Sequence, residues 1–495
     1  MAKQASTFEL SLPPQDSGTP AYRWLYEAVR RGILEGHMRP GARLPATRDF
    51  AKRYGLSRGT IVNAFEQLKS EGYVEGSVGS GTYVSRVLPE ELLHVAPDFR
   101  QAPLAQRKRT RRVSNYARRL KLFSGLRIQP SYAFRANLPA LDLFPMGLWA
   151  QITARRLRSA STSLLLGCDA LGYQPLREAV ADYLSASRGA KCAPGQIAIV
   201  SGAQQALDLA ARILLNPGDR VCLENPGYIG AAMAFEAMGV KIASVGVDNE
   251  GMKLEERCLR GARLVYVTPG HQFPLGISMS LSRRLALLEW ARKSGALIFE
   301  DDYDSEYRYS GRPLPAMQGL DRDGLVLLGG SFSKVLFPSL RLGYLVIPKD
   351  LVPHFAANLS VTSRHAPVLE QAVLCDFITG GHFGRHLRRM REVYAERLSV
   401  LLESAREELG GLLEISGVEA GLQTTGWLRE GMNGESAARA ANARGVEVVP
   451  LSRYTRGRSA REGLQLGFAA VEAREIRRGV RELAIALEAE RKTKN

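Results

Sequence analysis

Apolar residues in the first part of the chain recur three and four positions apart, which is the spacing of an amphipathic helix. The pattern predicts one helix from residue 21, ended near Gly36, and a second, shorter helix over residues 47–54. Ser57 can cap a third helix. The residues of this third helix that should face a core are Ile61, Ala64, Phe65 and Leu68.

Two β-type segments follow the third helix and enclose a glycine-rich stretch. Residues 73–74 and 82–84 flank Gly76-Ser-Val-Gly-Ser-Gly81, which predicts a two-stranded wing. Three helices and a wing predict a winged helix–turn–helix domain over residues 20–86. The preceding residues are rich in proline and glycine, which predicts a flexible lead-in.

The pattern changes after this domain. Residues 87–130 hold few large apolar residues and two basic runs, Arg107-Lys-Arg-Thr-Arg-Arg112 and Arg118-Arg119. We expect a basic linker here, partly helical near residues 116–122. Its charge either faces a polyanion or is simply solvated.

Residues 131–488 alternate short apolar runs with amphipathic stretches such as 204–215 and 282–294. The predicted strands are 197–200, 220–223, 264–268, 296–299, 325–328 and 343–347. This alternation predicts a mostly parallel α/β sheet covered by helices. Helical segments after Pro367, followed by β-type runs at 446–450 and 464–468, predict a small C-terminal α+β subdomain. The chain is therefore expected to be a multidomain protein.

Charge is distributed unevenly along the 495 residues, whose net charge is +17. Residues 1–130 carry 22 Lys and Arg against 11 Asp and Glu, and the rest carry 45 against 39. A basic N-terminal quarter favours a polyanionic partner, either DNA, RNA or an anionic lipid surface. A basic arm that only keeps the protein soluble would have the same composition.

The cysteine pattern and the lengths of the apolar runs indicate the cellular compartment of the protein. The five cysteines are scattered without a CxxC pair or a histidine at metal-ligand spacing, which indicates reduced thiols and no metal site. No uninterrupted apolar run reaches about 18 residues, so we expect no membrane span. The first residues lead into no apolar stretch of the kind found in signal peptides. The sequence therefore predicts a cytoplasmic protein.

The third predicted helix is a candidate for reading DNA. In a helix–turn–helix, the second helix of the motif enters the major groove and its first residues contact base edges. Ser57, Arg58 and Thr60 occupy these positions, and Arg58 can pair with guanine or bind phosphate. Arg48, at the start of the preceding helix, can hold the DNA backbone. The alternative is a protein-interaction module in which Arg58 is a surface charge.

Several motifs in this region follow one another in a recognisable order. They are Pro40-Gly-Ala-Arg-Leu-Pro45, Thr47-Arg48, Ser57-Arg-Gly-Thr60, Glu71-Gly-Tyr73 and Gly79-Ser-Gly-Thr-Tyr83. Residues 20–86 thereby resemble the GntR-type winged helix. The resemblance implies binding to a double-stranded DNA operator.

Polar residues follow several predicted strands of the large domain, where ligands of open α/β sheets bind. Lys334 ends the turn Ser331-Phe-Ser-Lys334 and is a candidate nucleophilic amine. Backbone N–H groups at a helix start bind phosphate well, and an arginine can clamp it. The residues predicted to hold a phosphate are Gly202, Ala203, Gln204, Ser331 and Arg341.

An acid and two aromatic residues complete this set. Pyridoxal phosphate (PLP) needs a lysine amine, a phosphate cradle, an acid for its ring nitrogen and an aromatic face. Asp301 would pair with the ring nitrogen, Tyr303 would donate to the ring oxygen, and Tyr228 would stack on the ring. Taken singly, each of these features also fits ordinary structure: a β–α turn, a solvated acidic loop or a core aromatic.

The order of these motifs at strand ends resembles the fold type I aminotransferases. Joined to the GntR-type head, the chain resembles the MocR family of PLP-binding transcription regulators over residues 20–485, and the motifs at 268–274 and 300–306 strengthen the resemblance. The resemblance implies PLP held as an internal aldimine on Lys334 and a head-to-tail homodimer. It also implies that Tyr173 reaches the partner's cofactor.

Two positions depart from the aminotransferase pattern. Gln465 stands where aminotransferases hold an arginine for the substrate carboxylate, and a neutral amide cannot replace a bidentate guanidinium. Phe273 stands before Pro274, where an asparagine usually binds the ring oxygen, so His271 or Gln272 would have to serve. These departures disfavour ordinary transamination and the sensing of a simple α-amino acid.

Three functions are compatible with the sequence. The first is a PLP-responsive, DNA-binding transcription regulator whose effector is PLP itself or a small amine. The second is a working aminotransferase with a DNA-binding appendage, and the third is a DNA-binding scaffold with an empty pocket. Gln465 disfavours the second, and the complete set of pocket residues disfavours the third, so we adopt the first as the hypothesis.

Overall fold

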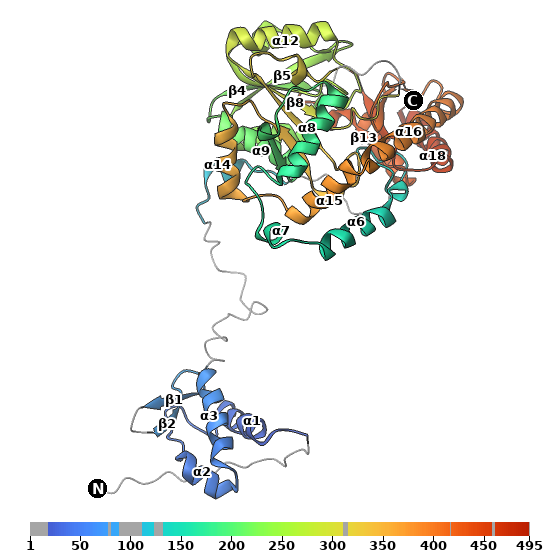
Figure 1. Ribbon diagram of the computed structural model, residues 1–495. Helices are drawn as coiled ribbons and strands as arrows, with labels where there is room; N and C mark the ends of the chain where they lie inside the picture. Colours follow the sequence, from blue (N-terminus) through green and yellow to red (C-terminus); the bar gives the residue numbers. More distant parts are fainter. Residues whose placement is uncertain are drawn as a thin grey trace. The chain divides into compact units, whose positions relative to one another are not determined.

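The chain divides into two compact units. The computed structural model describes residues 18–77, 81–88, 111–122, 132–309, 315–415, 417–457 and 461–494. The first unit is Met1–Arg111 and the second is Arg112–Asn495. The expected lead-in over residues 1–17, the tip of the wing at 78–80 and most of the expected linker lie outside the described residues. Figure 1 shows the elements of both units.

The N-terminal unit is a winged helix–turn–helix, as predicted. Its elements are α1 (Ala21–Leu34), α2 (Thr47–Tyr54), α3 (Arg58–Ser70), β1 (Val74–Ser77) and β2 (Gly81–Val84). The two strands pair antiparallel, with Val74 opposite Val84. Phe50 packs edge-on against Phe65 with ring centroids 5.5 Å apart, at the centre of the small core. The Ser57 hydroxyl accepts a hydrogen bond from Thr60 N at 3.1 Å, which confirms the predicted helix cap.

The second unit is built on an eight-stranded sheet in the order β3-β10-β9-β8-β7-β4-β5-β6. The strands are β3 (Ile197–Val200), β4 (Arg220–Asn225), β5 (Lys241–Asp248), β6 (Gly251–Met252), β7 (Ala262–Val267), β8 (Leu297–Asp302), β9 (Val326–Ser331) and β10 (Gly343–Val346). The neighbours from β9 to β5 are parallel, which confirms the predicted α/β sheet. Sequence patterning missed β5 and β6.

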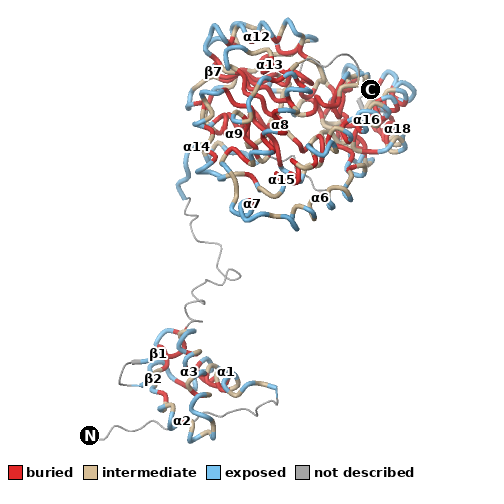
Figure 2. Tube along the Cα trace, viewed as in Figure 1, coloured by how far each residue is buried: buried red, intermediate tan, exposed pale blue. Residues whose placement is uncertain are grey.

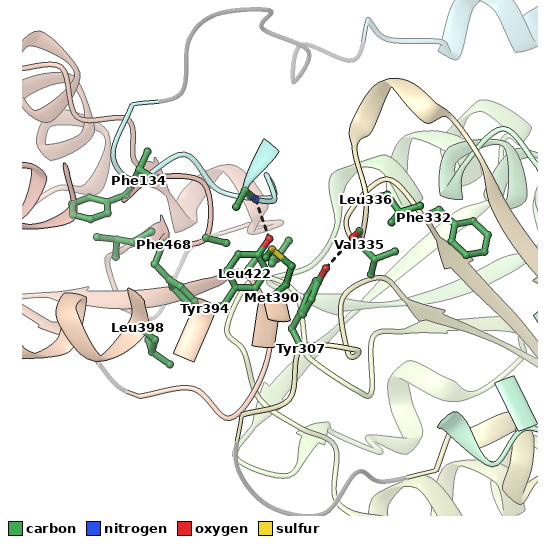
Figure 3. Packing of buried hydrophobic residues seen from close by; sticks show 14 of the residues in the cluster. Phe134, Tyr307, Phe332, Val335, Leu336, Met390, Tyr394, Leu398, Leu422 and Phe468 are labelled. Atoms are coloured by element: carbon green, nitrogen blue, oxygen red, sulfur yellow. Dashed lines mark hydrogen bonds between the residues drawn. The ribbon is translucent and has the colours of Figure 1, made fainter. Parts of the chain in front are cut away.

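Strand β10 runs antiparallel to both of its neighbours. It pairs with β9 so that Gly343 lies opposite Ser331, and residues 332–342 therefore form a closed loop between the two strands. This loop carries both Lys334 and Arg341. Tyr307 donates a hydrogen bond to Val335 O at 3.0 Å, and this bond holds the first part of the loop in place (Figure 3).

Helices cover the large sheet and leave its central strands β7 to β10 largely buried (Figure 2). The helices of this unit that precede the small subdomain are α5 (Asn115–Arg119), α6 (Met146–Arg158), α7 (Thr162–Leu166), α8 (Gln174–Arg188), α9 (Ala203–Leu214), α10 (Ile229–Met238), α11 (Glu256–Leu259), α12 (Leu281–Ser294), α13 (Met317–Leu320), α14 (Val352–Thr362) and α15 (Val368–Thr379). Short 3-10 helices are η1 (Leu141–Leu143), η2 (Pro194–Gln196), η3 (Pro338–Leu340) and η4 (Leu451–Tyr454). The helices predicted at 204–215 and 282–294 correspond to α9 and α12.

A smaller four-stranded antiparallel sheet, in the order β11-β12-β14-β13, forms the predicted α+β subdomain. Its elements are β11 (Leu413–Ile415), β12 (Gln423–Leu428), β13 (Val449–Pro450), β14 (Gly463–Gly467), α16 (His382–Glu408), α17 (Gly434–Ala443) and α18 (Ala473–Lys494). The prediction of a strand over 446–450 was too long, since only the last two residues are paired. Sequence patterning missed β11 and β12.

The linker segment that the structure describes packs onto the second unit. Helix α5 begins after its N-cap residue, Ser114, and ends at Arg119. It is therefore shorter than the helix predicted near residues 116–122. The Arg212 guanidinium of α9 lies 4.7 Å from the centre of the Tyr116 ring, and Arg119 donates to Ala237 O at 3.2 Å. This part of the linker is therefore docked on protein, an arrangement that neither of the two sequence-based alternatives included.

None of the helices in the described ranges combines the length and the apolar character needed to cross a membrane.

Candidate functional site

Gly202 and Arg341 form a cradle at the start of α9. Gly202 has a φ of 91°, a left-handed conformation that favours glycine, and it precedes the first helical residue, Ala203. Arg341 donates to Ser201 O at 2.9 Å. A Cβ added to Gly202 would lie 3.7 Å from Nη1 of Arg341. Helix-start N–H groups and a guanidinium thus face the same space, which suits a phosphate.

The other predicted phosphate and ring contacts border this cradle. Gln204 donates through Nε2 to Gly230 O at 2.9 Å, and the Tyr228 hydroxyl lies 3.4 Å from Gln204 Oε1. Ser331 accepts a hydrogen bond from Ser333 N at 3.2 Å at the start of the 332–342 loop. The structure therefore brings Tyr228 and Gln204 together and places Ser331 at the base of the loop that holds Lys334.

Lys334 is held in place by a residue far away in the sequence. Its Nζ donates to Asn137 O at 2.8 Å, and Asn137 N donates to Gln423 Oε1 at 2.9 Å. Burial lowers the pKa of Lys334 from 10.5 to about 8, and the positive charge of Arg341 adds to the effect, whereas Asp304 and Asp301 oppose it. A substantial fraction of this amine is therefore neutral near pH 8, as a nucleophilic lysine requires.

Asp301 has one oxygen that is bonded and one that is not. Tyr266 donates to Oδ2 at 2.7 Å, whereas Oδ1 is buried without a hydrogen-bond partner among the residues that the structure describes. Burial raises the pKa of Asp301 to about 7. A protonated ring nitrogen beside Oδ1 would both satisfy this atom and stabilise its charge.

Tyr303 lies beside a buried His271–Asp304 contact that connects two loops. Its hydroxyl is 3.0 Å from His271 Nδ1, which in turn is 3.0 Å from both carboxylate oxygens of Asp304. Gln272, the other candidate for the ring oxygen, uses Nε2 to donate to Pro226 O at 2.9 Å and to Phe273 O at 2.7 Å. Of the two candidates, His271 is the one that contacts Tyr303.

These residues fit PLP. Lys334 supplies the amine, Gly202 and Arg341 supply an anion cradle, and the unpaired oxygen of Asp301 supplies the partner for a ring nitrogen. When bound, PLP would supply an aldehyde and an electron-withdrawing ring to amines that enter the site. The protein's own residues would position that group through the contacts just described.

The shifted pKa of Lys334 predicts how PLP attachment depends on pH. Only the neutral amine attacks an aldehyde, so the rate of attachment should rise about tenfold per pH unit well below pH 8 and level off above it. Stopped-flow absorbance after mixing with PLP measures this rate, with Nα-acetyl-lysine as the unburied control. An inflection near 10.5 in both samples would contradict the buried environment of Lys334.

Three contacts that position the site were not found by sequence reasoning. Asn137 lies in a segment without a motif, Tyr266 lies inside a strand, and Gln423 belongs to the strand β12 that was missed. A polar residue within an otherwise apolar strand, as at Tyr266, is the signal that could have identified one of them.

In the N-terminal unit, the predicted DNA-contacting residues lie at helix starts. Arg58 is the first residue of α3 and is exposed, and Arg48 is exposed in the first turn of α2. Ser57 and Thr60 bond to each other through their hydroxyls at 2.8 Å. Arg43 was not predicted, yet its guanidinium lies against Gly81 of the wing, as a Cβ on that glycine would be 3.0 Å away. Arg43 therefore places a further basic side chain beside the wing.

Comparison with known proteins assigns both units. Residues 21–84 match the family of bacterial regulatory proteins, gntR family, and residues 141–483 match aminotransferase class I and II. The probable rhizopine catabolism regulatory protein MocR of Rhizobium meliloti is 39% identical over 95% of this chain and 94% of its own length. The HTH-type pyridoxine biosynthesis transcriptional regulator PdxR of Corynebacterium glutamicum is 30% identical over 94% of this chain and 95% of its own.

A solved aminotransferase shows the same fold as the second unit. The α-aminoadipate aminotransferase LysN of Thermus thermophilus, complexed with N-(5'-phosphopyridoxyl)-L-leucine, aligns with a TM-score of 0.70 at 29% identity. The alignment covers 77% of this chain and 98% of that one. The second unit thus has the fold type I aminotransferase architecture, which implies binding of PLP.

A gntR-type helix–turn–helix joined to an aminotransferase-like domain defines a class of DNA-binding transcription regulators. The chain belongs to this class and, within it, to the MocR family.

Proposed function

We propose that this protein regulates transcription in response to PLP or to an amine that binds beside PLP. PLP would be attached to Lys334, with its phosphate on Gly202, Ala203, Gln204, Ser331 and Arg341. Asp301 would pair with its ring nitrogen, Tyr303 would donate to its ring oxygen, and Tyr228 would stack on its ring. Arg48, Ser57, Arg58 and Thr60 contact the operator. The DNA-binding domain comprises residues 20–86, the linker comprises residues 87–130, and the aminotransferase-like effector domain comprises residues 131–488.

One observation carries the sensor half of the proposal. The buried Oδ1 of Asp301 has no hydrogen-bond partner in the described part of the chain, and the pKa of neighbouring Lys334 is lowered to about 8. A buried oxygen without a hydrogen-bond partner and a buried lysine both reduce the free energy of unfolding. In a cofactor site, the same two groups can bind a ring nitrogen and an aldehyde. The name of the related regulator PdxR, a regulator of pyridoxine biosynthesis, is consistent with a PLP signal.

The active form is a homodimer. A regulator that places two reading heads on one operator responds when its ligand favours one arrangement of the dimer. Tyr173 directly precedes α8 and is partly exposed, and its backbone N–H donates to Gln371 Oε1 at 2.8 Å. In a head-to-tail dimer its side chain would reach the partner's cofactor.

The test follows PLP binding and DNA binding in the same samples. The full-length protein is titrated with PLP, and its visible absorbance is compared with its affinity for a duplex selected by this protein from random-sequence DNA. We expect a new visible band, a change in DNA affinity of roughly 5- to 150-fold, and a steep loss of DNA affinity with salt. Absence of the band, or a DNA affinity that changes neither with PLP nor with added amines, would refute the proposal. Release of pyridoxamine phosphate over many turnovers would favour an aminotransferase instead.

A further inference from the structure

Gln465 holds a buried, unpaired donor on the small sheet. Its side chain is fully buried on β14, and its Oε1 accepts a hydrogen bond from the Tyr454 hydroxyl at 2.7 Å. Its Nε2 has no hydrogen-bond partner among the described residues. Because Tyr454 already donates to the carbonyl oxygen, the unsatisfied group of this amide is its N–H₂ donor.

Ring contacts connect Gln465 to the proposed cofactor site. Tyr454 packs edge-on against Phe273 with centroids 5.0 Å apart, and Phe273 lies 6.0 Å from Tyr303 and 5.7 Å from Tyr228. On the same face of the small sheet, Gln423 bonds to Asn137, which holds Lys334. Gln465, Tyr454, Phe273 and Gln423 therefore form one wall, which adjoins Tyr303 through Phe273 and Asn137 through Gln423.

The charges around this wall are unfavourable for an anion. The arginines that flank Tyr454 are both ion-paired, Arg453 with Glu435 at 3.0 Å and Arg456 with Glu236 at 2.6 Å. Three buried carboxyl groups lie close enough to Tyr303 to raise the pKa of its hydroxyl, and they belong to Glu224, Asp301 and Asp304. A ligand carboxylate placed against Gln465 would lose its hydration without gaining a cation.

We propose that the pocket selects a primary amine whose other polar groups are uncharged hydrogen-bond acceptors, such as hydroxyl oxygens, and rejects one that carries a carboxylate. The amine reaches the cofactor at Lys334, and a neutral oxygen accepts from Nε2 of Gln465. This inference rests on the proposed function, because it specifies the effector of the same site. Gln465 acts as a specificity-determining residue.

The test uses three amines that differ at one or two groups. L-Serine carries one hydroxymethyl group and one carboxylate on its amine-bearing carbon. Serinol (2-amino-1,3-propanediol) has a second hydroxymethyl group in place of the carboxylate. Isopropylamine has two methyl groups and no oxygen. Each is titrated into the full-length protein loaded with PLP, and the change in visible absorbance gives its dissociation constant, which isothermal calorimetry checks independently. We expect serinol to bind roughly tenfold or more tightly than the other two amines, because only serinol satisfies the buried donor without burying a charge.

Substitutions at Gln465 make the test specific. Gln465→Arg should reverse the order, so that L-serine binds more tightly than serinol, whereas Gln151→Arg on the exposed face of α6 should change nothing. If Gln465→Arg loses the PLP band, Gln465→Met decides, since it keeps the volume and should reduce serinol to the affinity of isopropylamine.

The two proposals fail in different ways. A wild-type protein without a PLP band refutes the proposed function. A wild-type protein that has the band, yet binds serinol no better than L-serine or responds to neither, overturns this inference alone. An amine preference that Gln465→Arg and Gln465→Met leave unchanged also overturns it.

Discussion

Lys334→Ala should abolish the visible absorbance of the PLP-loaded protein. The Nζ of Lys334 is the amine that the 332–342 loop and Asn137 hold in the pocket, at a distance of 2.8 Å from Asn137 O. Without this amine, PLP binds only through its phosphate and ring and exchanges with solvent. The protein should therefore leave a desalting column without a visible band, whereas the wild type keeps it.

Two controls separate chemistry from folding. Lys241→Ala removes an exposed lysine on β5 and should leave the band unchanged. The Lys334→Ala variant should show an unaltered circular dichroism spectrum, because its side chain makes one hydrogen bond and no ion pair in the described structure. Retention of the band by Lys334→Ala would show that another amine holds PLP.

Arg58→Ala should weaken binding to the selected operator by about 1–3 kcal/mol, which is roughly 5- to 150-fold. Arg58 is exposed at the first position of α3, where side chains reach base edges when the helix lies in the major groove. The loss should be larger on the selected duplex than on random DNA, because a base contact carries sequence information and a phosphate contact does not. Fluorescence anisotropy at fixed salt measures both affinities.

Arg31 and Arg48 provide matched comparisons for Arg58. Arg31→Ala alters an exposed arginine in the last turn of α1 and should leave operator affinity unchanged. Arg48→Ala should weaken all duplexes alike and reduce the salt slope by about 1, as expected of a phosphate contact. Equal losses for Arg58→Ala on selected and random DNA would instead assign Arg58 to the backbone.

Local patterns were sufficient to predict the winged helix. The cap at Ser57 and the apolar positions from Ile61 to Leu68 depend on contacts within a few residues, and the structure confirms both. The same holds for strands such as β3, whose apolar run is buried in full. By contrast, β12 was missed because Gln423 and Thr425 are polar residues that are buried against Asn137 and Pro274. They interrupt the apolar alternation on which strand prediction relies.

The sequence by itself determined the two kinds of domain and placed Lys334, Asp301 and Gly202 at the ends of strands, because these features follow from short-range patterns and matched motifs. Only the tertiary structure decided how the site is completed. Asn137 meets Lys334 across 197 positions of the chain. Gln465 is held by Tyr454, and Tyr454 meets Phe273 from another part of the chain. Such contacts arise when distant segments pack together, and no local spacing encodes them.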